Sequence, residues 1–262
     1  MKTINILVGP KLGDLFHMLI VPKYYYHFLN VKTNLYIIEK YDKFTTSLND
    51  TYEQLKPIIK AQEWCNSFRI YKYDTHIDVD LNAFRWNGLW ATRPFWAVFL
   101  HTAFPNQPIV PKNFASIKWS KNTEYSNTLV VSRRDIFPFN DFVKQQYLSV
   151  FERFENKIFL AFDPAQYEAF PLKDQVDLVV VKNLSEQLEI LNGSKMNLLN
   201  CSGPLCMASA LNAPRIIETG EWMVPVYGYD FLSYDNVETF DCHQVFSPNP
   251  EYLKSDILSQ IV

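Results

Sequence analysis

Short apolar runs alternate with longer amphipathic stretches along most of this sequence, and this alternation constrains the fold more than any other feature. It is typical of parallel βαβ units, in which each strand is followed by a helix that packs on the sheet. In the first half it predicts strands at Ile4–Val8, Asn34–Ile38, Phe68–Tyr73 and Ile77–Leu81. It also predicts a helix at Leu15–Leu29, kinked or restarted near Pro22, and a helix at Ser47–Gln62, opened by a Ser or Asn cap. In the second half it predicts strands at Thr128–Ser132, Lys157–Phe162, Val176–Val181, Met196–Leu199 and Arg215–Ile217, with helices at Asp141–Glu155 and Ser185–Asn192. We therefore expect an α/β protein of two Rossmann-like halves.

The alternation stops between Phe104 and Tyr125, where three prolines interrupt a polar stretch. Such a stretch is typical of a connection between domains. We expect a first domain over 1–115, a second over 125–245, and a C-terminal helix over 246–262 that packs back on the first domain.

Charge and residue spacing exclude several kinds of partner. The net charge of −3 and the pI near 6.0 provide no overall basic field for nucleic acid. No apolar run approaches the roughly 20 residues that a membrane-spanning helix needs, and the N-terminus shows no signal-peptide cleavage pattern. The 4 cysteines lack CxxC spacing and the 5 histidines form no HxH or HxxxH pair, so we expect no metal site. These features favour a soluble cytoplasmic protein.

A tight turn, Ser202-Gly203-Pro204, follows the predicted strand Met196–Leu199 and opens a helix of small residues, although the chain has only 7 glycines. Backbone N–H groups at such a helix start can bind an anion, usually a phosphate. The alternative is an ordinary tight connection in which glycine serves only the backbone geometry. The stretch from Gly9 to Asp14 repeats the device after the first strand. There Asp14 can serve as a general base or can merely cap the helix.

Two further clusters carry chemistry. Ser132-Arg133-Arg134-Asp135 directly follows a predicted strand, and paired arginines suit a diphosphate. Because adjacent residues of a strand point to opposite faces, we expect one of the two to reach a ligand, unless both only pair with nearby carboxylates. The second cluster, Arg85, Trp86 and Trp90, can hold a charged acceptor and stack on sugars or bases, or it can belong to the core.

Together these residues resemble the ADP-heptose:lipopolysaccharide heptosyltransferase family, inverting glycosyltransferases of the GT-B fold. The family's N-terminal signature, Gly-Asp followed by an apolar helix with a proline, reads here as Gly13 to Pro22. Its C-terminal signature, Asp-Ser-Gly-Pro-x-His-x-Ala-Ala-Ala-Leu-x-x-Pro, reads here as Cys201 to Pro214, and Leu184 to Leu188 is similar to its Ser-Leu-x-Glu-Leu helix start. The similarity extends over both halves and keeps the order of the motifs.

The resemblance implies two Rossmann-like domains facing a central cleft, the first binding the acceptor and the second a nucleotide-sugar. It implies transfer of a sugar to a hydroxyl of a glycan or other acceptor, with Asp14 as the base and no metal or other cofactor. The donor-binding residues implied are Gly13, Ser132, Arg133, Arg134, Ser185, Ser202, Gly203, Pro204, Leu205 and, toward the ribose, Glu218. The acceptor-binding residues implied are Arg85, Trp86 and Trp90.

This sequence also departs from the family pattern. Cys201 and Cys206 replace the Asp and His of the C-terminal signature, so their polar contacts to the donor are lost or replaced. Ser132-Arg133-Arg134 stands where the family has a lysine-bearing phosphate loop, and the chain is shorter than typical members. The donor sugar and its nucleotide therefore stay open.

Three alternatives follow. The acceptor can be a modified DNA base, as for some phage enzymes, although the acidic pI disfavours duplex binding. The loss of the Asp and His also suits a protein that binds a nucleotide-sugar without catalysis. A two-domain nucleotide-sugar epimerase would need a second acid–base pair that the sequence does not reveal.

Overall fold

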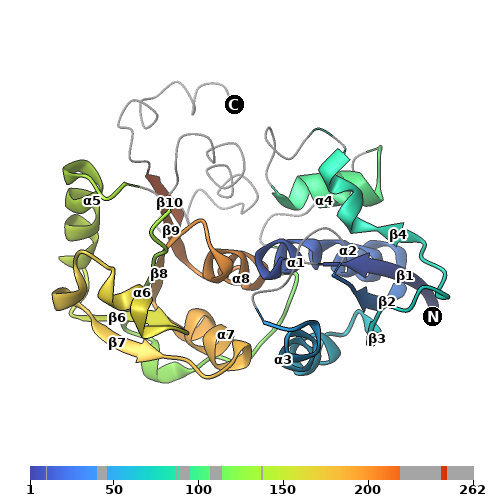
Figure 1. Cartoon of the computed structure of the whole chain (residues 1–262), viewed down its shortest axis with the longest axis horizontal. Helices are drawn as coiled ribbons and strands as arrows, with labels where there is room; N and C mark the ends of the chain where they lie inside the picture. The colour runs from blue at the N-terminus through green and yellow to red at the C-terminus, as the bar shows by residue number, and fades with distance from the viewer. Residues whose placement is uncertain are drawn as a thin grey trace.

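The structure, a computed structural model, contains two parallel β-sheets joined through packed helices (Figure 1). It describes residues 1–9, 11–39, 46–86, 88, 95–106, 114–136 and 138–218, together with the strand 243–246. The predicted α/β class with two Rossmann-like units is confirmed.

The first sheet has the strand order β3-β2-β1-β4, with every neighbouring pair parallel. Its strands are β1 (Lys2–Val8), β2 (Val31–Ile37), β3 (Cys65–Ile70) and β4 (Val79–Asp80). Its helices are α1 (Leu12–Met18), α2 (Ile20–Leu29), α3 (Leu48–Lys60), the 3₁₀ turn η1 (Leu81–Trp86) and α4 (Phe95–Ala103). The carboxyl ends of β1 and β4 lie side by side, so the segments that follow these two strands meet at one edge of the sheet.

The second sheet has the order β10-β9-β8-β5-β6-β7, again parallel throughout. Its strands are β5 (Thr128–Ser132), β6 (Asn156–Ala161), β7 (Asp177–Val180), β8 (Met196–Asn200), β9 (Arg215–Glu218) and β10 (His243–Phe246). Its helices are α5 (Asp141–Phe151), α6 (Pro164–Glu168), α7 (Leu184–Gly193) and α8 (Gly203–Leu211), and short 3₁₀ turns are η2 (Thr123–Tyr125) and η3 (Lys173–Gln175). Read in chain order, this is the 3-2-1-4-5-6 arrangement of the doubly wound dinucleotide-binding fold.

Side-chain caps explain where several helices begin. The Ser47 hydroxyl accepts a hydrogen bond from the amide of Asp50 at the start of α3, which confirms the predicted serine cap. Asn140, Asp163 and Asn183 cap α5, α6 and α7 in the same way. Each of these side chains accepts a hydrogen bond from one of the first-turn N–H groups, which have no partner within the helix.

The predicted helix Leu15–Leu29 is two helices that meet at Leu19, which closes α1 and opens α2. Proline is tolerated in the first turn of a helix, where its missing N–H has no intrahelical partner. Pro22 lies in the first turn of α2, so the chain breaks just before it. Of the two alternatives predicted at this proline, a kink or a restart, the structure shows the restart.

One cluster of the apolar core spans the two halves, and the second half has a further cluster of its own. α1 packs against α8, and α3 against α7, with α1 and α8 adjacent in the middle of the molecule (Figure 1). The same cluster of buried side chains contains Ile6 and Leu15 from the first half and Val130, Leu199 and Leu205 from the second. The two units are therefore packed on each other over a common hydrophobic interface.

The chain between the halves is hydrogen-bonded to both of them. On the first half, Gln62 donates from its side-chain amide to the carbonyl of Lys118 and accepts from the Lys118 N–H, at 3.0 and 2.8 Å. On the second half, the indole of Trp119 donates to the carbonyl of Ser185 at 3.1 Å. The last part of the proline-containing stretch, at Lys118 and Trp119, is thus bonded to both halves.

Three of the α-helices and strands in the described part of the chain were not predicted from the sequence, namely α4, α6 and β10. α6 has only 5 residues, too few to show a helical periodicity in the sequence. β10 pairs with β9 as a parallel strand at the edge of the sheet. The C-terminal helix predicted over 246–262 falls, beyond Phe246, outside the described residues.

Candidate functional site

The second sheet reverses its direction of winding between β5 and β8. From β5 the chain proceeds to β6 and β7 on one side, and from β8 to β9 and β10 on the other. Because crossovers between parallel strands are right-handed, the helices that follow β5 and β8 lie on opposite faces of the sheet. The crevice at the carboxyl ends of these two strands is where open α/β sheets bind their ligands.

Two of the predicted motifs flank this crevice. Ser132, the last residue of β5, pairs in register with Leu199 of β8. The loop of Arg133, Arg134 and Asp135 therefore lies beside the Ser202-Gly203-Pro204 turn. The two motifs are neighbours in the fold, although 67 positions separate Asp135 from Ser202 in the sequence (202 − 135).

Arg133 and Glu218 bind each other in a buried bidentate ion pair. The guanidinium donates from Nε to one carboxylate oxygen at 2.8 Å and from Nη2 to the other at 2.9 Å. The hydroxyl of Tyr147 on α5 donates to the same carboxylate at 2.7 Å, and Arg133 also stacks on the ring of Phe139. Burial in this apolar pocket raises the pKa of Tyr147 well above its usual value, and the charge of Glu218 raises it further.

This network revises two sequence-based expectations. Glu218 is fully buried, and both of its oxygens are bonded to Arg133 or Tyr147, so we no longer assign it to a ribose. Arg133 is 4% exposed and serves the same pair, so we move the expected diphosphate contact to Arg134, whose side chain is exposed. Arg134 also lines a hollow of about 280 Å³ between the β5 loop and α6.

The start of α8 presents its first turn toward the crevice. Ser202 is the extended residue before the helix, but its hydroxyl donates to the carbonyl of Asn200 at 3.0 Å and does not cap the helix. Pro204 lies in the first turn, as is common, and has no N–H. The amides of Gly203 and Leu205 belong to the first turn, where the helix itself offers no acceptor, while the side chain of Leu205 is in the core.

Gly203 has a conformation that any residue can adopt, because its φ is not in the left-handed region. A Cβ added there would meet nothing within 4 Å. The alternative that this glycine only satisfies the backbone of a tight turn is therefore not supported. Its missing side chain leaves open space at the helix start, which suits close approach of a ligand.

The first sheet has its own reversal between β1 and β4, and this brings together residues that are 71 positions apart (85 − 14). Asp14 follows β1, and Arg85 follows β4 in η1. The Arg85 guanidinium lies 3.5 Å from an Asp14 carboxylate oxygen, and both side chains are largely buried. Arg85 also stacks on Phe84 at 4.5 Å. Asp14 is the third residue of α1, whose N-cap position is Lys11, so Asp14 is not the N-cap.

The two sites meet where α1 contacts α8. A Cβ on Gly13 would lie 3.1 Å from the sulfur of Cys206, so the absence of a side chain lets the first turns of the two helices approach closely. Cys206, which stands where the resembled family has histidine, is 2% exposed, and its thiol donates to the carbonyl of Ser202 at 3.2 Å. Asp14 directly follows Gly13, the residue whose Cβ position lies against the first turn of α8.

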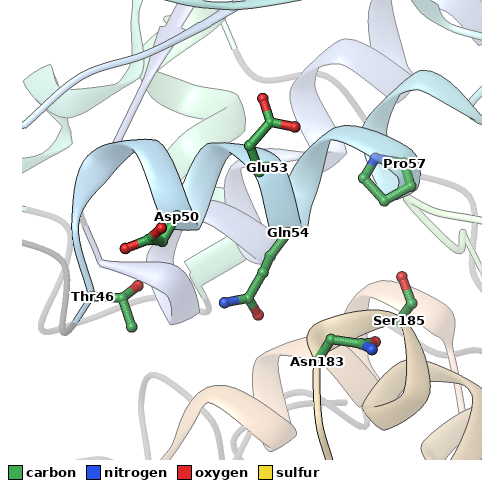
Figure 2. A pocket seen from close by; sticks show the side chains of 7 residues that line it. All are labelled: Thr46, Asp50, Glu53, Gln54, Pro57, Asn183 and Ser185. Carbon is green, nitrogen blue, oxygen red and sulfur yellow. The ribbon is translucent and has the colours of Figure 1, made fainter.

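Of the remaining predicted residues, the structure describes Trp86 and Ser185, while Trp90 lies outside the described residues. Trp86 is 66% exposed, so it is not a core residue. Ser185, at the start of α7, lines a hollow of about 630 Å³ between α3 and α7 (Figure 2). In that hollow Gln54 points from α3 toward the α7 start, while Glu53 points away from it.

Sequence reasoning missed Asn200 and Tyr147. Asn200 is the last residue of β8 and is fully buried, and its side chain bonds both the N–H and the carbonyl of Arg134. An asparagine directly after the predicted strand Met196–Leu199, next to the Ser-Gly-Pro turn, was a signal available in the sequence. Tyr147 carried no such signal, because it reads as one apolar position of an amphipathic helix.

Within the described part of the chain, no helix is both long and apolar enough to cross a membrane. In the same residues, no group of three or more His, Cys, Asp or Glu side chains is arranged to hold a metal ion.

Comparison with solved structures gives the class of fold. The two parallel Rossmann-like sheets match those of GT-B glycosyltransferases over nearly the whole chain. No protein-family model matches the sequence, and no curated protein matches it significantly.

The solved structures that this chain resembles include two heptosyltransferases and a glycosyl transferase family 9 protein. The structure of E. coli heptosyltransferase WaaC with ADP has a TM-score of 0.58 at 10% identity and covers 98% of each chain. A glycosyl transferase family 9 structure from Veillonella parvula has a TM-score of 0.54 at 10% identity, over 100% of this chain and 90% of the other. E. coli ADP-heptose LPS heptosyltransferase II has a TM-score of 0.52 at 8% identity, over 94% and 90%. At such identities the likeness establishes the fold.

Proposed function

We propose that this protein is an inverting glycosyltransferase that moves a sugar from a nucleoside diphosphate to an acceptor hydroxyl. The observation that carries the proposal is the close packing of α1 on α8, where a Cβ added to Gly13 would lie 3.1 Å from the sulfur of Cys206. A carboxylate beside one helix start and an exposed arginine near the other are the two groups that such a transfer needs. The likeness to heptosyltransferase structures supports the same reading.

In the proposed reaction Asp14 accepts the proton of the acceptor hydroxyl as its oxygen attacks the anomeric carbon. The attack comes from the face opposite the diphosphate, so the carbon–oxygen bond to the diphosphate breaks and the configuration inverts. The leaving diphosphate takes the electron pair. Its charge is stabilised by Arg134 and by the first-turn amides of Gly203 and Leu205. The donor would lie on the half over 125–245 and the acceptor on the half over 1–115, near Arg85 and Trp86.

A ligand screen tests the donor class first. Thermal unfolding is followed with ADP-, GDP-, UDP- and CMP-sugars and with the corresponding free nucleotides. A ligand that binds only the folded chain raises the melting temperature. If no nucleotide or nucleotide-sugar raises it, the proposed function is wrong.

Turnover then separates an enzyme from a binding protein. With the donor that binds, Asp14→Asn should lower kcat by about 10²- to 10⁴-fold while donor affinity changes little. Asp141→Asn, a matched loss of one carboxylate in the first turn of α5, should leave kcat unchanged. The anomeric configuration of the product, read by NMR, should be inverted relative to the donor. Full activity of Asp14→Asn would exclude the proposed base, and donor binding without turnover in the unaltered protein would indicate a non-catalytic role.

A further inference from the structure

The loop that carries Arg134 is held by one side chain from the neighbouring strand. The Asn200 amide accepts a hydrogen bond from the Arg134 N–H at 3.0 Å and donates one to the Arg134 carbonyl at 2.7 Å. These two bonds fix the orientation of the amide group, because only one assignment of its oxygen and nitrogen satisfies both. The side chain thus pairs with Arg134 as a peptide group of an adjacent strand would.

The backbone of the same residue holds the second loop of the crevice. The carbonyl of Asn200 accepts a hydrogen bond from the hydroxyl of Ser202, the residue directly before α8. Asn200 is fully buried at the carboxyl end of β8, so it cannot exchange these bonds for water. One residue therefore connects the loop with the exposed arginine to the turn that opens α8.

We infer that Asn200 is a positioning residue that aligns Arg134 with the start of α8 for binding of the donor diphosphate. The inference rests on the proposed function. A flexible arginine on a loose loop would lose conformational freedom on binding, whereas a backbone fixed in advance reduces that loss. Aspartate could not replace Asn200, because a carboxylate accepts hydrogen bonds only and would face the carbonyl of Arg134.

A double-mutant cycle tests this coupling. The probe is whichever of ADP, GDP, UDP and CDP binds the unaltered chain most tightly, measured by calorimetry. Arg134→Ala should weaken its affinity by about 10- to 100-fold, and Asn200→Ala by about tenfold. Because Asn200 acts through Arg134, adding Asn200→Ala to Arg134→Ala should weaken binding little further.

Asn197 supplies the matched control. It is a fully buried asparagine of the same strand, and its amide donates to the carbonyls of Leu191 and Pro214 at 3.0 and 2.8 Å. Asn197→Ala should lower the melting temperature and leave the affinity for the nucleoside diphosphate unchanged. If Asn200→Ala does not fold, Asn200→Ser, whose neutral hydroxyl buries no charge and is too short to bond both backbone groups of Arg134, should fold and show the weakened binding.

The outcomes separate the proposed function from the role of Asn200. Absence of binding by all four probes would overturn the proposed function together with this inference. Binding that Arg134→Ala weakens, but that folded Asn200 variants leave unchanged, would overturn the inference alone. The same holds if the effects of the two substitutions add in full.

Discussion

Gly203 shows how a single missing side chain can serve a ligand and not the fold. We expect Gly203→Ala to leave the melting temperature unchanged or slightly higher, because the new methyl group meets open space and alanine suits a helix better. The same methyl group should weaken nucleoside diphosphate binding by about tenfold or more, since it occupies the approach to the first-turn amides. Thermal unfolding and calorimetry measure the two effects separately.

Gly193 is the control for this substitution. A Cβ there would lie 2.0 Å from the backbone oxygen of Asn122, which cannot move as a flexible side chain can. Gly193→Ala should therefore lower the melting temperature. Gly203→Ala with unaltered ligand affinity would contradict the assignment of the α8 start to the diphosphate.

Glu218 is a residue whose loss should be felt in stability. Glu218→Gln removes the carboxylate and leaves the Arg133 guanidinium buried without its counter-charge, so we expect a loss of about 3–5 kcal/mol in the free energy of unfolding. Urea denaturation measures it. The net contribution of one neutral hydrogen bond is about 1 kcal/mol. A smaller loss than this would mean that water or another group replaces the carboxylate.

Because Tyr147 is buried, we expect the free energy of unfolding to depend on pH in the alkaline range. Burial first, and then the Glu218 carboxylate, raise the pKa of this hydroxyl in the folded state above its value in the unfolded chain, which is near 10. The stabilisation that comes from the protonated hydroxyl is complete below about pH 10 and is lost as pH rises further, because the unfolded state releases the proton first. Tyr147→Phe should therefore show a shallower loss of stability above pH 10 than the unaltered protein. Equal slopes in urea denaturation from pH 8 to 11 would contradict this.

At the scale of elements, the crossing of α1 over α8 depends on Gly13. Its Cβ position is 3.1 Å from the Cys206 sulfur, so a side chain there forces the helices apart. Gly13→Val should destabilise the fold by about 1–3 kcal/mol through overpacking. Adding Cys206→Ala, which removes the obstructing sulfur, should recover part of this loss. A double variant no more stable than Gly13→Val in urea denaturation would show that the obstruction lies elsewhere.

The elements also show where sequence patterns are reliable. β5 follows its predicted bounds, Thr128–Ser132, because a fully buried strand of a parallel sheet is a continuous apolar run. The α3 start was predictable because a serine cap is a local signal. The start of α1 was not, because Lys11 offers no side-chain cap and the helix begins three residues before the expected Leu15. As a result Gly13, expected in a turn, lies inside a helix.

At the scale of the whole molecule, the two halves should unfold together. One buried cluster contains side chains of β1 and of β8, so opening one half exposes apolar surface of the other. In native-state hydrogen exchange with increasing urea, the slowest amides of β1 and β8 should share one opening free energy. If the β8 amides open at a clearly lower free energy while β1 stays protected, the halves are independent folding units.

The sequence alone determined the kind of architecture and the positions of the chemistry-bearing loops. Periodicity, caps and glycine turns are local, so they identify strands, helices and the segments that follow Ile4–Val8, Thr128–Ser132 and Met196–Leu199. Only the tertiary structure decided which of these side chains are available. It paired Arg133 with Glu218 and Asp14 with Arg85, and it joined Asn200 to Arg134. Those partners are 66 to 85 positions apart, and such pairings follow from strand order and burial, which no local pattern encodes.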